Sequence, residues 1–196
     1  MRPFILGLTG SIGMGKSTTA VLFREAGVPV WDADAVVHKL YADGRAANAL
    51  RPHFPEAVEG ELVSRETLKR LLAESPSRIE ILDQVIHPLV AQDRESFLAA
   101  CEADILVLDI PLLFEKKSEH FCDAVLVVTA PKDIQRQRIV SRGTMTAEQI
   151  ELIIARQMPD EEKRSRADHI VETLSIAGVR AYVESLIQYI RTRGDA

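Results

Sequence analysis

The chain has 196 residues and a formal net charge of −5, and its 46% hydrophobic but only 5% aromatic composition suits an aliphatic α/β core. This length fits one domain with room for an inserted subdomain, and the negative charge argues against a nucleic-acid-binding protein. No run of about 18 apolar residues could cross a membrane, and the N-terminus lacks the features of a signal peptide. We therefore expect a cytoplasmic protein in which Cys101 and Cys122 are reduced.

A phosphate-binding loop separates the first predicted strand from the first predicted helix. Residues 4–9 predict a short buried strand, and residues 17–26 predict a helix. Between them, residues 10–17 fit the pattern G-x-x-x-x-G-K-[ST] at every fixed position. Glycines let such a loop turn several backbone N–H groups toward one anion, while Lys16 reaches the β- and γ-phosphates and Ser17 binds Mg²⁺. The loop predicts nucleotide binding, but it does not indicate which molecule would receive a phosphoryl group.

Two carboxylates follow the second predicted strand, residues 28–32. Asp32 and Asp34 lie at the end of this strand, where open α/β sheets bind ligands. An aspartate there could take the proton of an attacking hydroxyl or hold Mg²⁺ through water. The alternative is a structural role, with Asp34 as the N-cap of the following helix.

Residues 35–103 predict a helical block without a convincing strand. The expected breaks between its short helices are Gly44, residues 52–55, Gly60, Pro76 and Pro88. The block is large for a simple crossover, so we interpret it as an inserted substrate-binding subdomain, with a purely structural helical cap as the alternative.

His87 lies at an expected helix boundary inside this block. Pro88 suits the first position of a helix, which would place His87 just before it as a cap, a surface residue or a functional residue. The other histidines show no ligand spacing, and the chain has no His/Cys cluster typical of a zinc site.

A third strand, residues 105–109, ends in a second candidate magnesium ligand. The aliphatic run predicts a strand buried on both faces, and Asp109 at its end has the form of a Walker B carboxylate that acts on Mg²⁺ beside Ser17. Residues 111–115 then predict a loop at the same edge of the sheet. Glu115 at its end either belongs to the substrate site or its surroundings, or is an ordinary solvated charge.

Two helices after the fourth strand, residues 123–129, resemble the lid of small-molecule kinases. The first is basic and begins at Lys132; the second, residues 147–158, is opened by a capping box of Thr146 and Gln149. Arg138 and Arg142 share one face of the first helix and could clamp phosphates, although a solvated basic helix is the alternative.

The chain ends with a fifth predicted strand, entered at residues 166–171, and an amphipathic helix. Apolar residues recur through residues 179–190 at helical spacing, so this helix is expected to pack on the sheet.

Taken together, these motifs resemble those of the dephospho-CoA kinase family over nearly the whole chain. The matching segments are residues 8–10 leading into 13–18, 32–34, 86–88, 111–115, 135–142, 157–159 and 166–168. The combination of Asp-Ala-Asp, His-Pro and Pro-Leu-Leu-Phe-Glu at these distances is much more specific than the phosphate loop alone.

The resemblance implies a reaction and a fold. The reaction is ATP-dependent phosphorylation of the ribose 3′-hydroxyl of dephospho-CoA, which gives coenzyme A and ADP in the last step of CoA synthesis. The implied fold is the α/β P-loop kinase fold, a five-stranded parallel sheet flanked by helices. The core would comprise residues 1–34, 104–135 and 167–196, with a helical substrate subdomain at 35–103 and a lid at 136–166.

The resemblance also implies roles for individual residues. The residues expected to cradle ATP are Gly13, Met14, Gly15, Lys16, Ser17 and Thr18. Asp32 is the first choice for activating the hydroxyl and Asp34 the second, and Arg138 and Arg142 are the lid arginines. The expected substrate contacts are Asp34, His87, Leu113 and Glu115, and the expected Mg²⁺ ligands are Ser17, Asp32 and Asp109. The implied ligands are ATP, Mg²⁺ and dephospho-CoA, with no nucleic acid or membrane partner, in a monomer or weak homo-oligomer.

Two departures from the family pattern stand out. Residues 172–175 read Glu-Thr-Leu-Ser where the family usually has Asn followed by Gly, which leaves any contact of that Asn, and the nucleotide preference, open. Gly143 follows Arg142 in place of the usual Asp, which loosens the expected lid hinge.

Rival functions are another small-molecule kinase of this fold and a non-catalytic ATP-binding regulator. A Ras-like GTPase is excluded, because its guanine-reading motif needs an asparagine and the only asparagine in the chain is Asn48.

Overall fold

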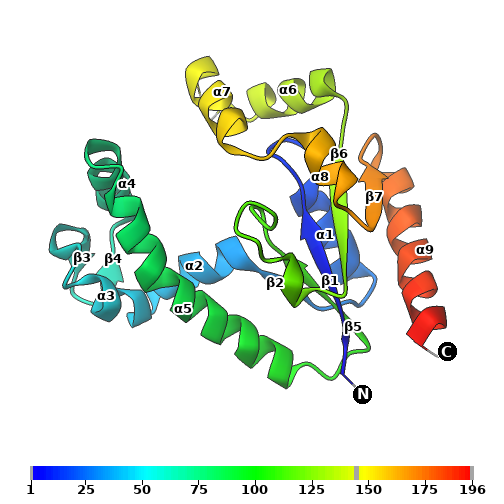
Figure 1. Cartoon of the computed structure of the whole chain (residues 1–196), viewed down its shortest axis with the longest axis horizontal. Helices are drawn as coiled ribbons and strands as arrows, with labels where there is room; N and C mark the ends of the chain where they lie inside the picture. The colour runs from blue at the N-terminus through cyan, green and yellow to red at the C-terminus, as the bar shows by residue number, and fades with distance from the viewer. Residues whose placement is uncertain (1, 144–145, 195–196) are drawn as a thin grey trace. The chain divides into compact units, whose positions relative to one another are not determined.

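The computed structural model describes residues 2–143 and 146–194, so two residues of the expected lid, 144 and 145, lie outside it. The chain divides into two compact units. One combines Met1–Trp31 with Cys101–Ala196, and the other is Asp32–Ala100. Figure 1 labels their elements.

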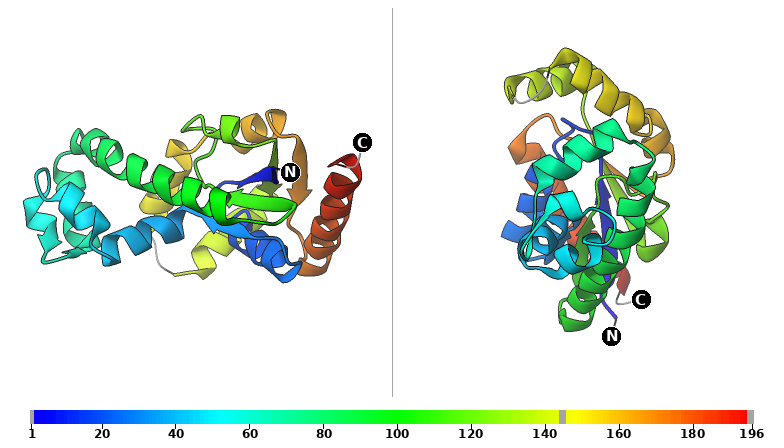
Figure 2. Two further views of the ribbon diagram at one scale, coloured as in Figure 1. Left: turned by 90° about the horizontal axis from the view of Figure 1, so that it is seen from below. Right: turned by 90° about the vertical axis from the view of Figure 1, so that its left-hand side faces the viewer.

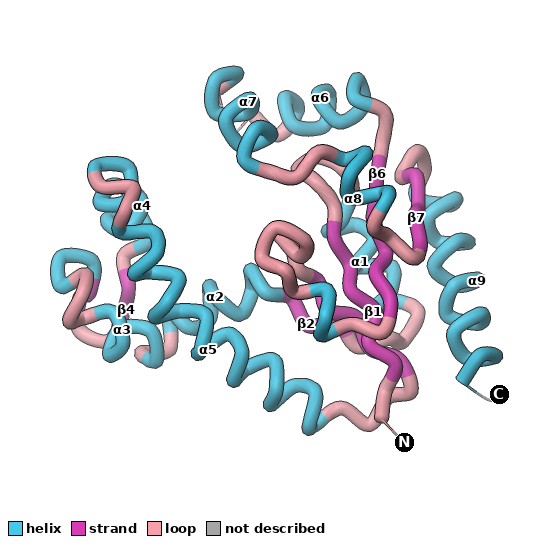
Figure 3. The backbone as a smooth tube through the Cα atoms, viewed as in Figure 1, coloured by secondary structure: helices cyan, strands magenta, loops and turns pink. Residues whose placement is uncertain are grey.

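The first unit is built on a five-stranded sheet in the order β2-β5-β1-β6-β7. β1 pairs in parallel with β5 and with β6, and β6 pairs in parallel with β7. Figure 3 draws the strands in magenta. The strands are β1 (Phe4–Thr9), β2 (Val30–Asp32), β5 (Ile105–Asp109), β6 (Ala124–Thr129) and β7 (His169–Glu172). The predicted α/β fold class with a five-stranded parallel sheet is confirmed.

Helices complete this unit. They are α1 (Lys16–Glu25), α6 (Lys132–Ser141), α7 (Ala147–Arg156), α8 (Asp160–Ser165) and α9 (Ile176–Gly194), with a 3₁₀ turn at Glu119–Phe121. The predicted capping box opens α7, because Gln149 N donates to Thr146 Oγ1 and Thr146 N donates to Gln149 Oε1. The short helix α8 was not predicted.

The central strands β1, β5 and β6 are buried on both faces, which explains why their sequences are mainly aliphatic runs. Leu126 and Val128 of β6 join a cluster with residues of α1 and α9, whereas Val125 and Val127 join a second cluster with Leu113 and Phe114. Successive side chains of a strand point to opposite faces, so the two clusters are the two layers of the core.

The second unit is mainly helical. Its elements are α2 (Ala33–Ala42), α3 (Arg45–Leu50), a 3₁₀ turn at Pro55–Ala57, β3 (Val58–Glu59), β4 (Leu62–Val63), α4 (Arg65–Glu74) and α5 (Arg78–Ala100). The long green helix α5 packs alongside α2 and α3 (Figure 2).

The expectation that residues 35–103 contain no strand is wrong. β3 and β4 form an antiparallel hairpin around a turn at Gly60, whose φ of 61° lies in the left-handed region that glycine adopts without a steric penalty. Each strand has only two residues, which is too short to produce a recognisable alternation of apolar and polar side chains.

The expectation that Pro88 begins a helix is also wrong. α5 begins ten residues earlier at Arg78 and continues through Pro88. Proline has no N–H to donate to the carbonyl of residue 84. Gln84, His87 and Pro88 are all exposed, so water can satisfy that carbonyl. His87 is therefore a mid-helix residue, and its Nε2 lies 3.6 Å from Asp83 Oδ1 one turn earlier.

A buried ion pair joins the loop after β5 to the chain after α7. Glu115 Oε1 accepts the N–H of Met158 at 2.8 Å and lies 2.8 Å from Nζ of Lys163, whose side chain is 0% exposed. Burial alone would raise the pKa of Glu115, but Lys163 and the Met158 N–H outweigh it and lower the pKa below its ordinary value. Arg166 adds a contact over the ring of Phe114. The end of the expected lid is thus fixed to the loop that contains Glu115.

No helix in residues 2–143 and 146–194 is both long enough and apolar enough to span a bilayer.

We expect Glu115→Gln to destabilise the protein at neutral pH. Glutamine still accepts from the Met158 N–H, but it leaves the buried Lys163 ammonium without its counter-charge. Removing one partner of a buried ion pair costs roughly 3–5 kcal/mol in the free energy of unfolding, measurable by urea denaturation. Glu25→Gln, which breaks an exposed pair with Arg180, is the matched control and should change stability little.

The effect should depend on pH in one direction. Because the pKa of Glu115 is lower in the folded protein, its stabilisation is complete above the unfolded value of about 4.3 and is lost as the pH falls through the folded value. The difference between wild type and Glu115→Gln should therefore shrink on acidification. A difference that grew would contradict the ion pair.

Candidate active site

The phosphate loop connects β1 to α1, and its glycines are required by close packing. Gly13 and Gly15 have φ values of 78° and 92°. A Cβ on Gly10 would lie 2.4 Å from Val128 Cγ2, and one on Gly13 would lie 2.7 Å from Ile139 Cγ1. Any larger residue would push the loop away from β6 and α6.

Side chains outside the loop hold two of its carbonyl groups. Gln135 Nε2 donates to the carbonyl of Ile12 at 2.8 Å, and Thr173 Oγ1 donates to the carbonyl of Met14 at 2.8 Å. Because a trans peptide is planar, the N–H groups of Gly13 and Gly15 point away from these carbonyls. The outward hydrogen bonds therefore help to turn the amides inward, as an anion-binding loop requires.

Lys16 and Asp109 lie in direct contact. Nζ of Lys16 is 2.5 Å from Oδ1 of Asp109, and their side chains are 15% and 2% exposed. Asp109 ends β5, and its Cα pairs with Leu8 on the strand that leads into the loop. Ser17 and Thr18 follow Lys16 in the first turn of α1 and are exposed. The structure thus brings Asp109 to the start of the helix that carries the loop lysine.

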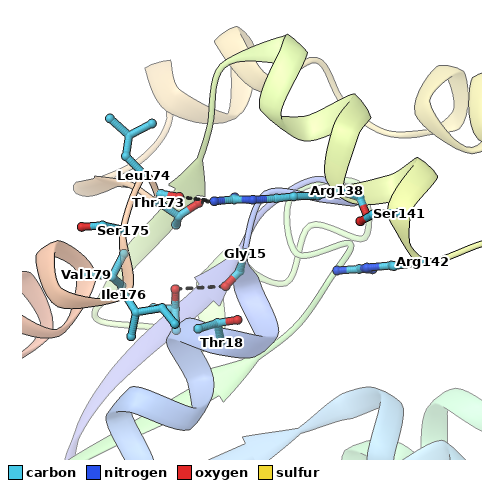
Figure 4. A pocket seen from close by; sticks show the side chains of 11 residues that line it. Gly15, Thr18, Arg138, Ser141, Arg142, Thr173, Leu174, Ser175, Ile176 and Val179 are labelled. Carbon is cyan, nitrogen blue, oxygen red and sulfur yellow. Dashed lines mark hydrogen bonds between the residues drawn. The ribbon is translucent and has the colours of Figure 1, made fainter.

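A cavity of about 380 Å³ opens beside this helix start. Figure 4 shows Arg138 of α6 and Arg142, the C-cap of this helix, extending into it opposite Gly15 and Thr18. Its lining residues are Gly15, Thr18, Thr19, Arg138, Ser141, Arg142, Thr173, Leu174, Ser175, Ile176 and Val179. Arg138 Nη1 donates to Thr173 Oγ1 at 2.8 Å, and its Nη2 donates to the Thr173 carbonyl. Both predicted lid arginines therefore line a space next to the phosphate loop.

Asp32 is the last residue of β2 and the N-cap of α2. Its Oδ1 accepts the N–H of Ala35 at 3.0 Å, while Asp34 is an exposed residue in the first turn. The alternative of Asp34 as the cap is therefore wrong. Asp32 ends β2, which is the neighbour of β5 in the sheet.

Two expected substrate residues have other surroundings. Leu113 is 0% exposed in a hydrophobic cluster, so neither its side chain nor its backbone is open to a substrate in this structure. Glu115 is in the ion pair with Lys163 rather than in solvent, which excludes the solvated-charge alternative for the structure described.

Three polar residues near the loop had no assigned role from the sequence. Gln157 Oε1 accepts the N–H of Ile12 at 3.0 Å, so Gln157 and Gln135 bind the same loop residue. Thr173 binds both Met14 and Arg138. Gln135 and Gln157 lay in segments that match the family, but a polar side chain gives no sign of a contact more than a hundred residues away.

Comparisons with known proteins identify the family of the chain. The family model described as dephospho-CoA kinase matches residues 4–177. A dephospho-CoA kinase of Cereibacter sphaeroides is 57% identical over 100% of both chains, and one of Ruegeria pomeroyi is 50% identical over 96% of both.

Solved structures share the fold. The protein TT1252 from Thermus thermophilus has a TM-score of 0.86 and 35% identity over 96% of this chain and 98% of its own. A shikimate kinase from Bacteroides thetaiotaomicron, at 14% identity and a TM-score of 0.53 over 96% and 98%, shares the fold alone. Because the family model spans residues 4–177 and a relative at 57% identity aligns along both whole chains, this chain belongs to the dephospho-CoA kinase family.

Proposed function

We propose that this protein transfers the γ-phosphoryl group of ATP in line to the ribose 3′-hydroxyl of dephospho-CoA, giving coenzyme A and ADP. The observation that carries the proposal is the contact of Lys16 with Asp109 at the start of α1, beside a cavity lined by two arginines. Phosphoryl transfer asks a protein mainly for positioning and charge stabilisation, which such an arrangement supplies.

Residues 13–18 form the proposed donor site. Backbone N–H groups and the N-terminus of α1 bind the phosphates, and Lys16 neutralises charge on the β- and γ-phosphates. Lys16 must exchange its contact with Asp109 for phosphate oxygens when the nucleotide binds. Phosphate oxygens thus replace the Asp109 carboxylate beside the Lys16 ammonium, which is already largely shielded from water.

The same residues fit a magnesium ion. In kinase sites Mg²⁺ takes one or two protein ligands together with phosphates and water. Ser17 and Asp109 offer a hydroxyl and a carboxylate at the loop, and Asp32 is the third proposed ligand. The described residues contain no group of three or more His, Cys, Asp or Glu side chains that could hold a metal ion. When bound, the ion neutralises charge on the transferring phosphates.

Arg138 and Arg142 are proposed to stabilise the transferring group. Arg138 is anchored by Thr173, and Arg142 is an exposed residue at the C-cap of α6 that lines the same cavity. Fixed guanidinium groups aimed at developing charge contribute strongly in a site from which water is excluded.

The proposed acceptor side uses the helical unit. Asp32 accepts the proton of the ribose hydroxyl, with Asp34 as the second choice, and Asp34 and His87 contact dephospho-CoA. Leu113 supports this side from the hydrophobic cluster that it shares with Phe114, and Glu115 supports the lid end through Lys163. We further propose a cytoplasmic monomer or weak homo-oligomer without nucleic acid or membrane partners.

Product analysis tests the reaction itself. With ATP and Mg²⁺, mass spectrometry should show dephospho-CoA gaining one phosphoryl group, with ADP release that depends on it. Release stimulated by AMP, uridine or shikimate instead would identify another small-molecule kinase. ATP binding without acceptor-stimulated ADP release would indicate a regulator.

Lys16→Ala should lower kcat by about 10²–10³, as for other preorganised charge contacts. Lys132→Ala removes an exposed lysine from the first turn of α6 and is the matched control, with kcat unchanged. Steady-state kinetics with purified protein check both, and near-normal turnover of Lys16→Ala would refute the donor site as drawn.

Asp32→Asn and Asp34→Asn distinguish the two candidate bases. Asparagine caps helices as well as aspartate does, so Asp32→Asn keeps α2 while removing the base. We expect a loss of about 10²–10⁴ in kcat for Asp32→Asn and a much smaller loss for Asp34→Asn. Small and equal losses would leave neither aspartate as the base.

A further inference from the structure

We propose that Thr173 is a positioning residue that holds the phosphate loop and Arg138 in one arrangement before ATP binds. The inference deepens the proposed function and rests on it for the identity of the donor site. Thr173 stands in the segment where this chain departs from the usual family sequence.

Thr173 is fixed at the edge of the sheet. It directly follows β7, its N–H donates to the carbonyl of Thr129 at 2.8 Å, and it is 5% exposed. Its position is therefore set by β6 and β7 rather than by a free loop.

One hydroxyl connects two parts of the site, as Figure 4 shows for Arg138. Thr173 Oγ1 donates to the carbonyl of Met14 at 2.8 Å, with the carbonyl of Thr129 farther away at 3.3 Å. The same oxygen accepts from Arg138 Nη1 at 2.8 Å. A hydroxyl has one hydrogen, so the donation fixes the loop while a lone pair holds the arginine.

The bond to Met14 orients the peptide between Met14 and Gly15, one residue before Lys16. The carbonyl of Met14 and the N–H of Gly15 belong to one planar peptide. Gly15 also packs directly on Thr173, since a Cβ there would lie 2.8 Å from Thr173 Oγ1. Thr173 thus contacts the loop through its hydroxyl and through packing.

Arg138 forms two hydrogen bonds to Thr173. Nη1 binds the hydroxyl and Nη2 binds the backbone carbonyl of the same residue. A guanidinium has five N–H donors, so the others are left for the cavity that Arg138 lines. Prior fixation removes the cost of ordering a long side chain when ATP binds.

The polar groups of Thr173 are all engaged by the protein. Its N–H, hydroxyl and carbonyl bind Thr129, Met14 and Arg138. The side chain therefore acts through the loop and the arginine, and not by reading the nucleotide base.

The test compares Thr173→Val, which removes the hydroxyl at nearly constant volume, with Thr173→Ser, which keeps it. Loss of a buried hydrogen bond that leaves both partners unsatisfied predicts a drop of about 10- to 100-fold in kcat/KM for ATP in Thr173→Val. Thr173→Ser should stay within about threefold of wild type, since the hydrogen bonds remain. Thr192→Val, which removes an exposed hydroxyl bonded to the Tyr189 carbonyl in α9, is the matched control and should be unchanged.

Two further readouts separate positioning from a general structural role. In an Arg138→Ala background, Thr173→Val should cost much less than it does alone, because coupled residues are not additive. The ratio of kcat/KM for ATP to that for GTP should not change. Full additivity, a changed ratio or wild-type kinetics in Thr173→Val would each overturn the proposal.

Calorimetric titration with ATP alone keeps the inference separate from the proposed reaction. Thr173→Val should bind ATP more weakly than Thr173→Ser even if dephospho-CoA were not the acceptor. Thermal unfolding shows whether each variant is folded at the assay temperature. Equal ATP affinity in the two folded variants would refute the positioning role, whatever the acceptor is.

Discussion

The close packing of the loop glycines against β6, α6 and Thr173 is the constraint on which the rest of the site depends. There is no room for a side chain at Gly10, Gly13 or Gly15, so the loop backbone lies directly on its supports. Side chains from three distant segments then bond the loop, and these bonds direct the following lysine into α1. This path of the loop backbone places Lys16 at the start of α1, where it contacts Asp109.

Strong local patterns made the core of the fold predictable. β1 and β5 have the predicted bounds, because a strand buried on both faces is a continuous aliphatic run between polar residues. The hairpin at β3 and β4 has no such pattern, and α5 passes through Pro88 on an exposed face where water tolerates the missing hydrogen bond. These two elements depend on surroundings that the local sequence does not contain.

In the site, too, some contacts could be predicted from local sequence patterns and others could not. The contact of Lys16 with Asp109 was foreseeable, since the loop motif and the strand-end aspartate each have a local pattern. The spacing of Arg138 and Arg142 also predicted a shared face, and both line one cavity. The supports of the loop and the pairing of Glu115 with Lys163 were not foreseeable, because they join residues far apart in sequence through ordinary polar side chains. The roles proposed for the individual site residues stay predictions.

Gln135 and Gln157 give the segment between them an unusual anchorage. They lie near the start of α6 and just after α7, and both bind the backbone of Ile12. The chain between Gln135 and Gln157 therefore forms a loop whose two ends are both hydrogen-bonded to Ile12. The entropic free-energy cost of closing such a loop grows slowly, by about 0.6 kcal/mol for each doubling of its length. A change in the length of the chain between α6 and α7 should therefore cost little as long as Gln135 and Gln157 keep their bonds to Ile12.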